Sequence, residues 1–438
     1  MDEQRLVRAL RRGPPFATGY VPSSIALEDA PVARPLFSVG RLALVIAITA
    51  LLLAGLLAGL VAVGARHDVL PVANGWIAFV RSGPTDPGGR EEHDIYLVRE
   101  GEAGHRVVGS DTDRTEQLCP MFSPDGRRLA HGEADGTADT GYQGAALVIS
   151  DIDAAGNASE VLRIAVGGTY PPPCAAWSAD GRMVAFGVPL TSPTNPERSA
   201  AGSQVWVASV EDGRVDVLAD LLATDLEWSP VSSELAIASG QTDLVRGETL
   251  RDGSIRLYDA PSGEMRILVG PSGVGSLSWS PDGSRIAYQR GSSDGAGMDQ
   301  EIWVIGVDGS RNHRIASGFG SIRGIGPVWS PTGDRIVYQR MKGAGTEAHD
   351  VVLVTPDGER EVVLPDLRLP GDDPSISRRP DSVNWSPDGR ELLYVVWISG
   401  RPGSALIARP VELGSDPVDL QEDPVRGENR SWGRLPDR

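Results

Sequence analysis

The sequence predicts an all-β protein, a β-propeller of four-stranded blades preceded by one transmembrane helix. An aromatic residue followed by Ser-Pro-Asp-Gly, or by a close variant, occurs six times at intervals of 50 to 56 residues. Short runs rich in β-branched and aromatic residues follow each motif, as is typical of strands. A charge-free apolar run occupies residues 42–64. A period near fifty residues indicates a repeat architecture rather than a single irregular domain.

The motif predicts a turn between two antiparallel strands. In residues 279–283, Pro presets φ at the second turn position, and Gly accepts the positive φ that a following bulge requires. The second, third and fourth strands of this repeat are expected at 286–288, 301–305 and 313–316. One repeat is therefore a four-stranded meander, which is the blade of a propeller. The six motif aromatics are Phe122, Trp177, Trp228, Trp279, Trp329 and Trp385.

The strand count favours seven blades, with six as the alternative. Seven second strands and seven third strands can be recognised, but only six aromatic first strands. The missing first strand belongs to the blade that closes the ring, since an open ring leaves exposed strand edges. Residues 69–72 and residues 431–432 are the two candidates for that strand. One turn departs from the pattern, because Ser-Pro-Val-Ser-Ser follows Trp228.

The apolar run at 42–64 is long enough to cross a bilayer as a helix. The alternative is a cleaved signal peptide, whose apolar region usually has about 7–15 residues. This run is longer and follows a 41-residue segment, so an uncleaved anchor is expected. Six Arg precede the span and only Arg66 follows closely. The positive-inside rule therefore predicts a single-pass protein of the cell membrane with a cytoplasmic N-terminus and an extracytoplasmic propeller.

These features divide the chain into four expected parts. They are a cytoplasmic tail with a short helix (1–41), a transmembrane helix (42–64), a linker (65–73) and the propeller (74–438). Gly55 and Gly59 form a Gly-x-x-x-Gly motif within the span. That spacing predicts a weak homodimer through the membrane helices, or it arises by chance among many small residues.

The net charge of −18 limits the classes of partner. Nucleic acid requires a basic face, so an acidic chain argues against nucleic-acid binding. The sequence contains no Gly-x-Ser-x-Gly, no His-Glu-x-x-His and no phosphate-binding loop. We therefore expect no catalytic residue, no cofactor and no metal site.

The two cysteines, Cys119 and Cys174, each lie three residues before a motif aromatic. Matched positions in adjacent blades of an extracytoplasmic domain suggest a disulfide between those blades. The alternative is two buried thiols, because equivalent side chains point the same way. A bond requires the two Cα atoms to lie within about 7 Å. Zinc binding is not expected, since neither Cys-x-x-Cys nor a nearby His cluster accompanies them.

Two positions of each inner strand are expected to face the central channel. They lie one and three residues before the aromatic, and strand alternation places them opposite it. The aromatic is then free to pack between blades. We take the polar side chains at these positions as a candidate binding site at the channel mouth; the alternative is a water-filled channel. The candidates are Asp225, Glu227, Ser276, Ser278, Ser382 and Asn384.

The Trp-Ser-Pro-Asp-Gly-x-x-Ile-Ala-Tyr run at 279–288, followed by Ile-Trp-Val-Ile-Gly-Val-Asp-Gly at 302–309, resembles the TolB-type β-propeller repeat, a relative of WD-repeat blades. The resemblance covers about residues 74–420. It implies protein or peptide binding in the bacterial cell envelope. The family's translocation protein is similar only in its propeller, since it is soluble and periplasmic and has an N-terminal α/β domain in place of an anchor.

Three functions follow as hypotheses. The first is a membrane-anchored propeller that binds or scaffolds proteins or peptides outside the cytoplasm. The second is a transmembrane regulator whose cytoplasmic tail binds a transcription-regulatory partner. The third is an envelope enzyme, a hydrolase or lyase, with its site on the propeller face. The motif itself is a turn and a packing device, so the function is expected to depend on the loops and the channel.

Overall fold

The structure of the chain is a computed structural model. All described residues belong to the second of two compact units, residues 69–438. The expected tail, span and linker, and with them Gly55 and Gly59, lie outside the described residues. Within the described part, no helix is long and apolar enough to cross a membrane. The described residues are 74–82, 93–99, 104–108, 115–136, 143–167, 173–192, 195–243, 248–291, 300–319, 326–341, 349–367, 378–398, 404–412, 417–421 and 425–434.

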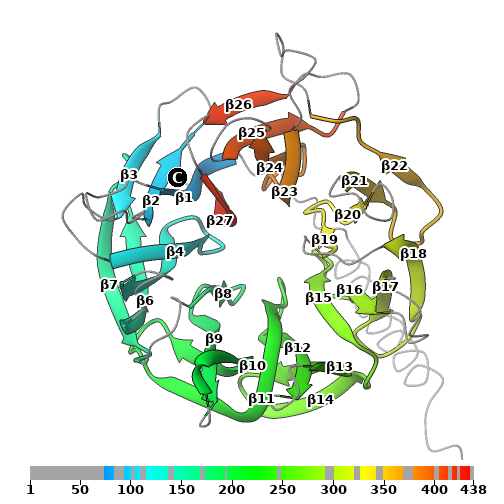
Figure 1. Cartoon of the computed structure of the whole chain (residues 1–438), viewed down its shortest axis with the longest axis horizontal. Helices are drawn as coiled ribbons and strands as arrows, with labels where there is room; N and C mark the ends of the chain where they lie inside the picture. The colour runs from blue at the N-terminus through cyan, green and yellow to red at the C-terminus, as the bar shows by residue number, and fades with distance from the viewer. Residues whose placement is uncertain are drawn as a thin grey trace, which may run out of the picture. The chain divides into compact units, whose positions relative to one another are not determined.

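The described residues form an all-β structure whose sheets follow one another around a ring (Figure 1). Five sheets have four strands and one sheet has seven. Strands that are consecutive within a sheet pair antiparallel, as the meander plan requires. This is the propeller arrangement that the repeat predicts.

The first sheet joins the two ends of the described chain. Its inner strand comes from the C-terminal region, where Trp432 pairs with Ile77. Of the two segments expected to supply the missing inner strand, residues 431–432 pair with β1. The other candidate, residues 69–72, lies outside the described part. The strands of this sheet, in order, are β27 (Val425–Arg434), β1 (Asn74–Ser82), β2 (His93–Val98) and β3 (His105–Val108).

The seven-stranded sheet consists of two repeats that share one strand. In β11, residues 215–218 pair with β10 as an outer strand, and residues 223–228 pair with β12 as the inner strand of the next repeat. The strands are β8 (Ala175–Trp177), β9 (Met183–Ser192), β10 (Asn195–Ser209), β11 (Val215–Trp228), β12 (Glu234–Asp243), β13 (Glu248–Asp259) and β14 (Glu264–Val269).

The other four sheets each contain one repeat. The first consists of β4 (Thr115–Phe122), β5 (Arg128–Asp135), β6 (Gln143–Ile152) and β7 (Ala158–Ala165). The next consists of β15 (Val274–Trp279), β16 (Arg285–Gly291), β17 (Gln300–Gly306) and β18 (His313–Phe319). The third consists of β19 (Val328–Trp329), β20 (Ile336–Met341), β21 (His349–Val354) and β22 (Glu361–Val363). The fourth consists of β23 (Arg378–Trp385), β24 (Glu391–Ile398), β25 (Ser404–Pro410) and β26 (Val418–Gln421).

The hydrophobic core is divided into clusters, most of which lie between neighbouring repeats. In one cluster, Ala236 and Ile255 from the seven-stranded sheet pack with Trp279 and Tyr288 from the following sheet. All six motif aromatics are buried, with Trp279 only 3% exposed. Large aromatic side chains contribute much of the buried apolar area. The aromatic therefore packs between blades, as the alternation of the inner strand predicts.

The motif turns have the geometry that the sequence predicts. The Gly283 N–H donates to the Ser280 carbonyl at 2.8 Å, which closes a four-residue turn, and Gly283 has φ of +66°. The Ser280 hydroxyl donates to Asp282 and accepts the Arg285 N–H at 2.9 Å. The same Gly-to-Ser bond closes four further turns. They begin at Ser123, Ser178, Ser330 and Ser386.

The turn after Trp228 differs, as its sequence indicates. Ser232 donates its N–H to the hydroxyl of Ser229 at 3.2 Å, and no Gly occupies the left-handed position. The strand pairing persists, because the Ser229 N–H still donates to the Glu234 carbonyl at 2.8 Å. The motif residues therefore shape the turn, while the flanking strands hold the blade.

Candidate functional site

The inner strands are linked to one another by the indoles of the motif tryptophans. In three cases the Nε1–H of one blade donates to the carbonyl that precedes the aromatic of the blade before it. These bonds run from Trp177 to Met121 (3.0 Å), from Trp279 to Glu227 (3.0 Å) and from Trp385 to Val328 (3.1 Å). The buried Nε1 groups of Trp228 and Trp329 have no hydrogen-bond partner among the described residues.

Side chains one residue before the aromatic add a second set of links. A carboxylate oxygen of Glu227 accepts the main-chain N–H of Trp279 at 3.0 Å. The hydroxyl of Ser278 accepts the N–H of Trp329 at 3.1 Å in the same way. Asn384 instead accepts the N–H of the next residue in its own strand at 2.9 Å. Two of these candidate binding residues therefore also join neighbouring blades.

The position three residues before the aromatic is a contact point between blades. Asp225 accepts the Leu277 N–H of the next inner strand at 2.9 Å, and the Leu226 N–H at 2.9 Å. A Cβ atom on Gly326 would lie 2.2 Å from the Cβ of Ser276. At this position the side chains are therefore small, or polar and bonded across the interface.

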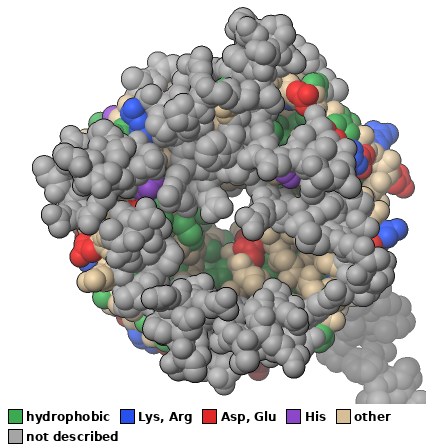
Figure 2. Space-filling model, viewed as in Figure 1, with side chains coloured by type: hydrophobic (Ala, Val, Ile, Leu, Met, Phe, Trp, Pro, Cys, Tyr) green, Lys and Arg blue, Asp and Glu red, His purple; other side chains and the backbone are tan. Residues whose placement is uncertain are grey.

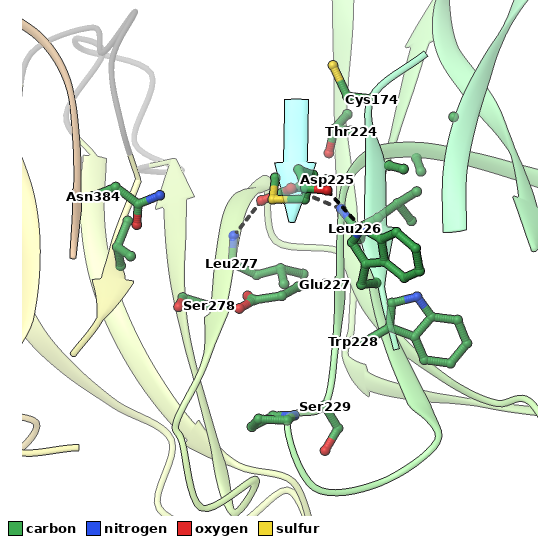
Figure 3. Close-up of a pocket in the computed structure, with 18 of the residues that line it drawn as sticks. Cys174, Thr224, Asp225, Leu226, Glu227, Trp228, Ser229, Leu277, Ser278 and Asn384 are labelled. Carbon is green, nitrogen blue, oxygen red and sulfur yellow. Dashed lines mark hydrogen bonds between the residues drawn. The ribbon is translucent and has the colours of Figure 1, made fainter. Parts of the chain in front are cut away.

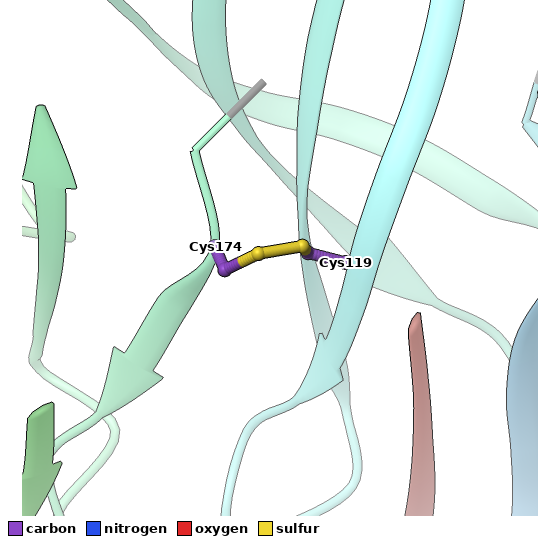
Figure 4. Close-up of a disulfide and its surroundings, with 2 residues drawn as sticks. All are labelled: Cys119 and Cys174. Atoms are coloured by element: carbon purple, nitrogen blue, oxygen red, sulfur yellow. A yellow bond between two sulfur atoms is a disulfide. The ribbon is translucent and has the colours of Figure 1, made fainter. Parts of the chain in front are cut away.

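The two cysteines occupy this position in the sheets that contain β4 and β8. Their Sγ atoms are joined in a disulfide, with the Cα atoms 5.1 Å apart (Figure 4). Cys119 has φ of 56°, and the pairing of β4 with β5 is irregular between Leu118 and Met121. Regular alternation therefore does not hold at Cys119, which is why its side chain need not point the same way as that of Cys174.

A cavity of about 870 Å³ lies at the inner strands. Its wall includes residues from β4, β8, β11, β15, β19 and β23. Of the six candidate binding residues, Asp225, Glu227, Ser278 and Asn384 line it (Figure 3). Ser276 and Ser382 are not part of its lining, and Ser382 is buried. The volume lies within the range of about 300–1,000 Å³ that is typical of ligand sites.

The lining is apolar except for a few polar groups. Among the described lining residues, the ionisable side chains are the carboxyls of Asp225 and Glu227, and no basic side chain is present. Figure 2 shows acidic and apolar side chains inside the central opening of the molecule. The apolar part of the wall consists of Met121, Leu226, Leu277, Val328 and Val383, with several alanines and prolines. The cavity therefore combines two acidic groups with apolar surface.

The environment of the two carboxyls raises the pKa of each. Burial raises the pKa of Glu227 well above its ordinary value, and the charge of Asp225 adds to this effect. Burial also raises the pKa of Asp225, against the opposing hydrogen bonds from Leu277 and Leu226. A cationic group in the cavity would favour the ionised form of both. Among the described residues, no group of three or more His, Cys, Asp or Glu is placed to hold a metal ion.

Sequence reasoning missed a buried polar pair between β2 and β4. His93 Nδ1 lies 3.2 Å from Glu116 Oε1, and the two side chains are each only 2% exposed. His131 on β5 is also buried; burial, and next the charge of Arg163, lower its pKa to about 4, so it is neutral at pH 7. Isolated His residues in strand-like runs carry no sequence signal that distinguishes them from exposed ones.

No protein-family model and no curated protein matches the sequence. The chain is similar to the structure of a prolyl endopeptidase at 16% identity and a TM-score of 0.56, covering 81% of this chain and 49% of that one. It is similar to the periplasmic gluconolactonase of Pseudomonas aeruginosa at 15% identity and a TM-score of 0.53, covering 82% and 99%. It also aligns with a TolB candidate from Agrobacterium tumefaciens at 18% identity, covering 62% and 88%.

The shared feature is the fold alone. At a TM-score of 0.40, the alignment with the TolB candidate carries no argument of its own. The chain spans about half the length of the prolyl endopeptidase. Enzymes thus occur among proteins of similar fold, but identities below one fifth transfer no activity.

Proposed function

We propose that this chain is a membrane-anchored, extracytoplasmic propeller of seven blades that binds a protein or peptide in its central cavity. One observation supports the binding role most directly. The cavity is large, mostly apolar, and has Asp225 and Glu227 as the ionisable groups of its described lining. The count of seven treats the seven-stranded sheet as two blades that share β11.

The chemistry of the cavity favours a basic side chain of a peptide. Lys and Arg have apolar stems that suit an apolar wall, and cationic ends that pair with carboxylates. Burial raises the pKa of Glu227, and a cation that binds there would lower it again by stabilising the ionised carboxylate. The proposal assigns no catalytic role to any residue of the cavity.

Site-specific photocrosslinking in native membranes tests the binding role. A photoreactive amino acid is placed at Thr224, which is exposed and lines the cavity, and separately at Ile267, which is 62% exposed on the outer strand β14. The expected result is a discrete crosslinked protein or peptide from position 224 that is absent from position 267. Identical products at both positions, or none at 224, would contradict the proposal.

The anchor and its orientation have a separate test. A C-terminal epitope tag on the full chain should be digested by protease added to spheroplasts, and the chain should stay in the membrane fraction at high pH. A tag that is digested only after lysis would place the propeller in the cytoplasm.

An affinity capture with residues 1–41 addresses the alternative function, in which the tail binds a regulatory partner.

A further inference from the structure

The disulfide between β4 and β8 lies in the wall of the cavity. Cys174 is exposed and belongs to the cavity lining, whereas Cys119 is partly buried. Buried structural disulfides are protected from reagents, while exposed ones exchange with thiols more readily. Cys174 therefore lies where a small molecule that enters the cavity can reach it.

The backbone at Cys119 is in the left-handed region. Its φ of 56° is one of two positive values among non-glycine residues in the described part of the chain. Such a conformation costs free energy for a residue with a Cβ, and it persists where the surroundings impose it. The pairing of β4 with β5 is irregular at the same place. Opening the disulfide would remove one constraint on this segment.

We propose that Cys119–Cys174 is a thiol-exchange site that opens into the cavity, and that a small neutral or cationic dithiol is its reductant. A thiolate of the dithiol attacks Sγ of Cys174, forming a mixed disulfide and releasing Cys119 as a thiolate. The second thiol of the reductant, once ionised, displaces Cys174 and closes the reductant's own disulfide. The dithiol loses two electrons and two protons, and the two cysteines gain them.

The charge of the cavity selects among thiols. Asp225 occupies, in the inner strand of the next repeat, the position that Cys174 occupies in β8, and it lines the same cavity together with Glu227. In their ionised form, these carboxyls repel an anionic thiol and attract a cationic one, and salt screens both effects. Cationic thiols should therefore react faster than anionic thiols of equal intrinsic reactivity.

Exchange would also change the cavity wall. Met121, two residues after Cys119, lines the cavity, and its carbonyl accepts the indole N–H of Trp177 at 3.0 Å. Relaxation of the backbone at Cys119 would shift this carbonyl. Indole fluorescence should therefore change on reduction while the β-sheet signal in circular dichroism stays constant.

Thiol trapping on the folded full chain in detergent tests the inference. Dithiothreitol is added without denaturant, and a maleimide reports the free thiols by mass. We expect two labelled thiols per chain, the full cysteine content, with unchanged circular dichroism. Labelling that appears only after guanidinium unfolding would overturn the proposal. The double variant Cys119→Ser with Cys174→Ser must take no label.

A second measurement tests the charge selectivity. Reduction rates with cysteamine and with mercaptopropionate are each divided by the rate of the same thiol with a small exposed disulfide. The normalised rate should be several-fold higher for cysteamine, and the ratio should approach one at high salt. Equal normalised rates at low salt would contradict attack inside the cavity. Neither readout depends on the proposed peptide ligand, so a failed crosslinking experiment leaves this inference standing.

Discussion

Trp279 and Glu227 hold each other at two points across the interface between neighbouring repeats. The indole N–H of Trp279 donates to the carbonyl of Glu227 at 3.0 Å, and its main-chain N–H donates to the Glu227 carboxylate at 3.0 Å. The same carboxylate lines the central cavity. A side chain that holds two blades together is thus also part of the candidate binding site, so its structural and binding roles must be separated by experiment.

The tryptophans provide an internal comparison. The Trp279→Phe substitution removes a satisfied indole hydrogen bond, whereas Trp329→Phe removes an N–H with no partner among the described residues. Both substitutions delete a similar volume from a buried site. We expect Trp279→Phe to cost about 0.5–1.5 kcal/mol more in the free energy of unfolding. Denaturant unfolding of the two variants measures the difference.

Further members of the same set serve as replicates. Trp385→Phe should behave like Trp279→Phe, and Trp228→Phe like Trp329→Phe, because the indole partners divide in this way. Equal destabilisation by all four substitutions would show that the indole bonds add nothing to packing.

Gly326 is expected to tolerate no larger side chain. A Cβ there would meet the Cβ of Ser276 at 2.2 Å, so Gly326→Ala must push two inner strands apart. Forcing atoms into a packed contact costs about 1–3 kcal/mol. Gly270→Ala is the matched control, since a Cβ at that glycine meets nothing within 4 Å. Thermal unfolding should show a lower Tm for the first variant only, and equal Tm values would contradict the close contact.

Ser280 of the motif accepts a main-chain N–H within the turn, whereas Ser284 in the same turn serves as its comparison. Ser280 is fully buried, and its hydroxyl bridges Asp282 and the Arg285 N–H. Ser280→Ala leaves that N–H without its acceptor, which we expect to cost about 1–3 kcal/mol. Ser284→Ala removes an exposed hydroxyl that also donates to Asp282, a bond that water can replace, so it should cost far less. The urea midpoints of unfolding of the two variants test this prediction. A similar decrease in both midpoints would count against a bridging role of Ser280.

The repeat made much of the fold predictable from the sequence. The turn is local, so Ser, Pro, Asp and Gly at fixed positions determine its hydrogen bonds without reference to distant residues. The closing strand was less certain, because β27 pairs with β1 across more than 330 residues and lacks the Ser-Pro-Asp-Gly turn. Two segments therefore fitted the pattern equally well.

The candidate site was predictable in position but not in its bonds. Strand alternation placed Asp225 and Glu227 towards the channel, and both line the cavity. Their hydrogen bonds to Leu277 and Trp279 depend on how adjacent sheets are offset, which no single repeat encodes. The same offset, together with the irregular backbone at Cys119, brings the two cysteines together, although regular alternation would have kept them parallel.

Stability should depend on pH through the cavity carboxyls. Burial raises the pKa of Glu227 well above its ordinary 4.5, with a further contribution from Asp225. Between the ordinary value and the raised value, the folded chain therefore binds more protons at this group than the unfolded chain. The contribution of Glu227 to the free energy of unfolding is thus largest below about pH 4.5 and decreases as the pH rises through that window.

Glu227→Gln isolates this contribution. The amide keeps an oxygen that can accept the Trp279 N–H but cannot ionise. Other carboxyls, such as Asp282, have a lowered pKa, so their contribution to the free energy of unfolding increases with pH. The informative quantity is therefore the free energy of unfolding of the wild type minus that of the variant. We expect this difference to fall steadily as the pH is raised from 4.5, measured by denaturant unfolding. A cationic ligand in the cavity should bind more tightly over the same range, and a difference that rises with pH would show that Glu227 is stabilised in its ionised form.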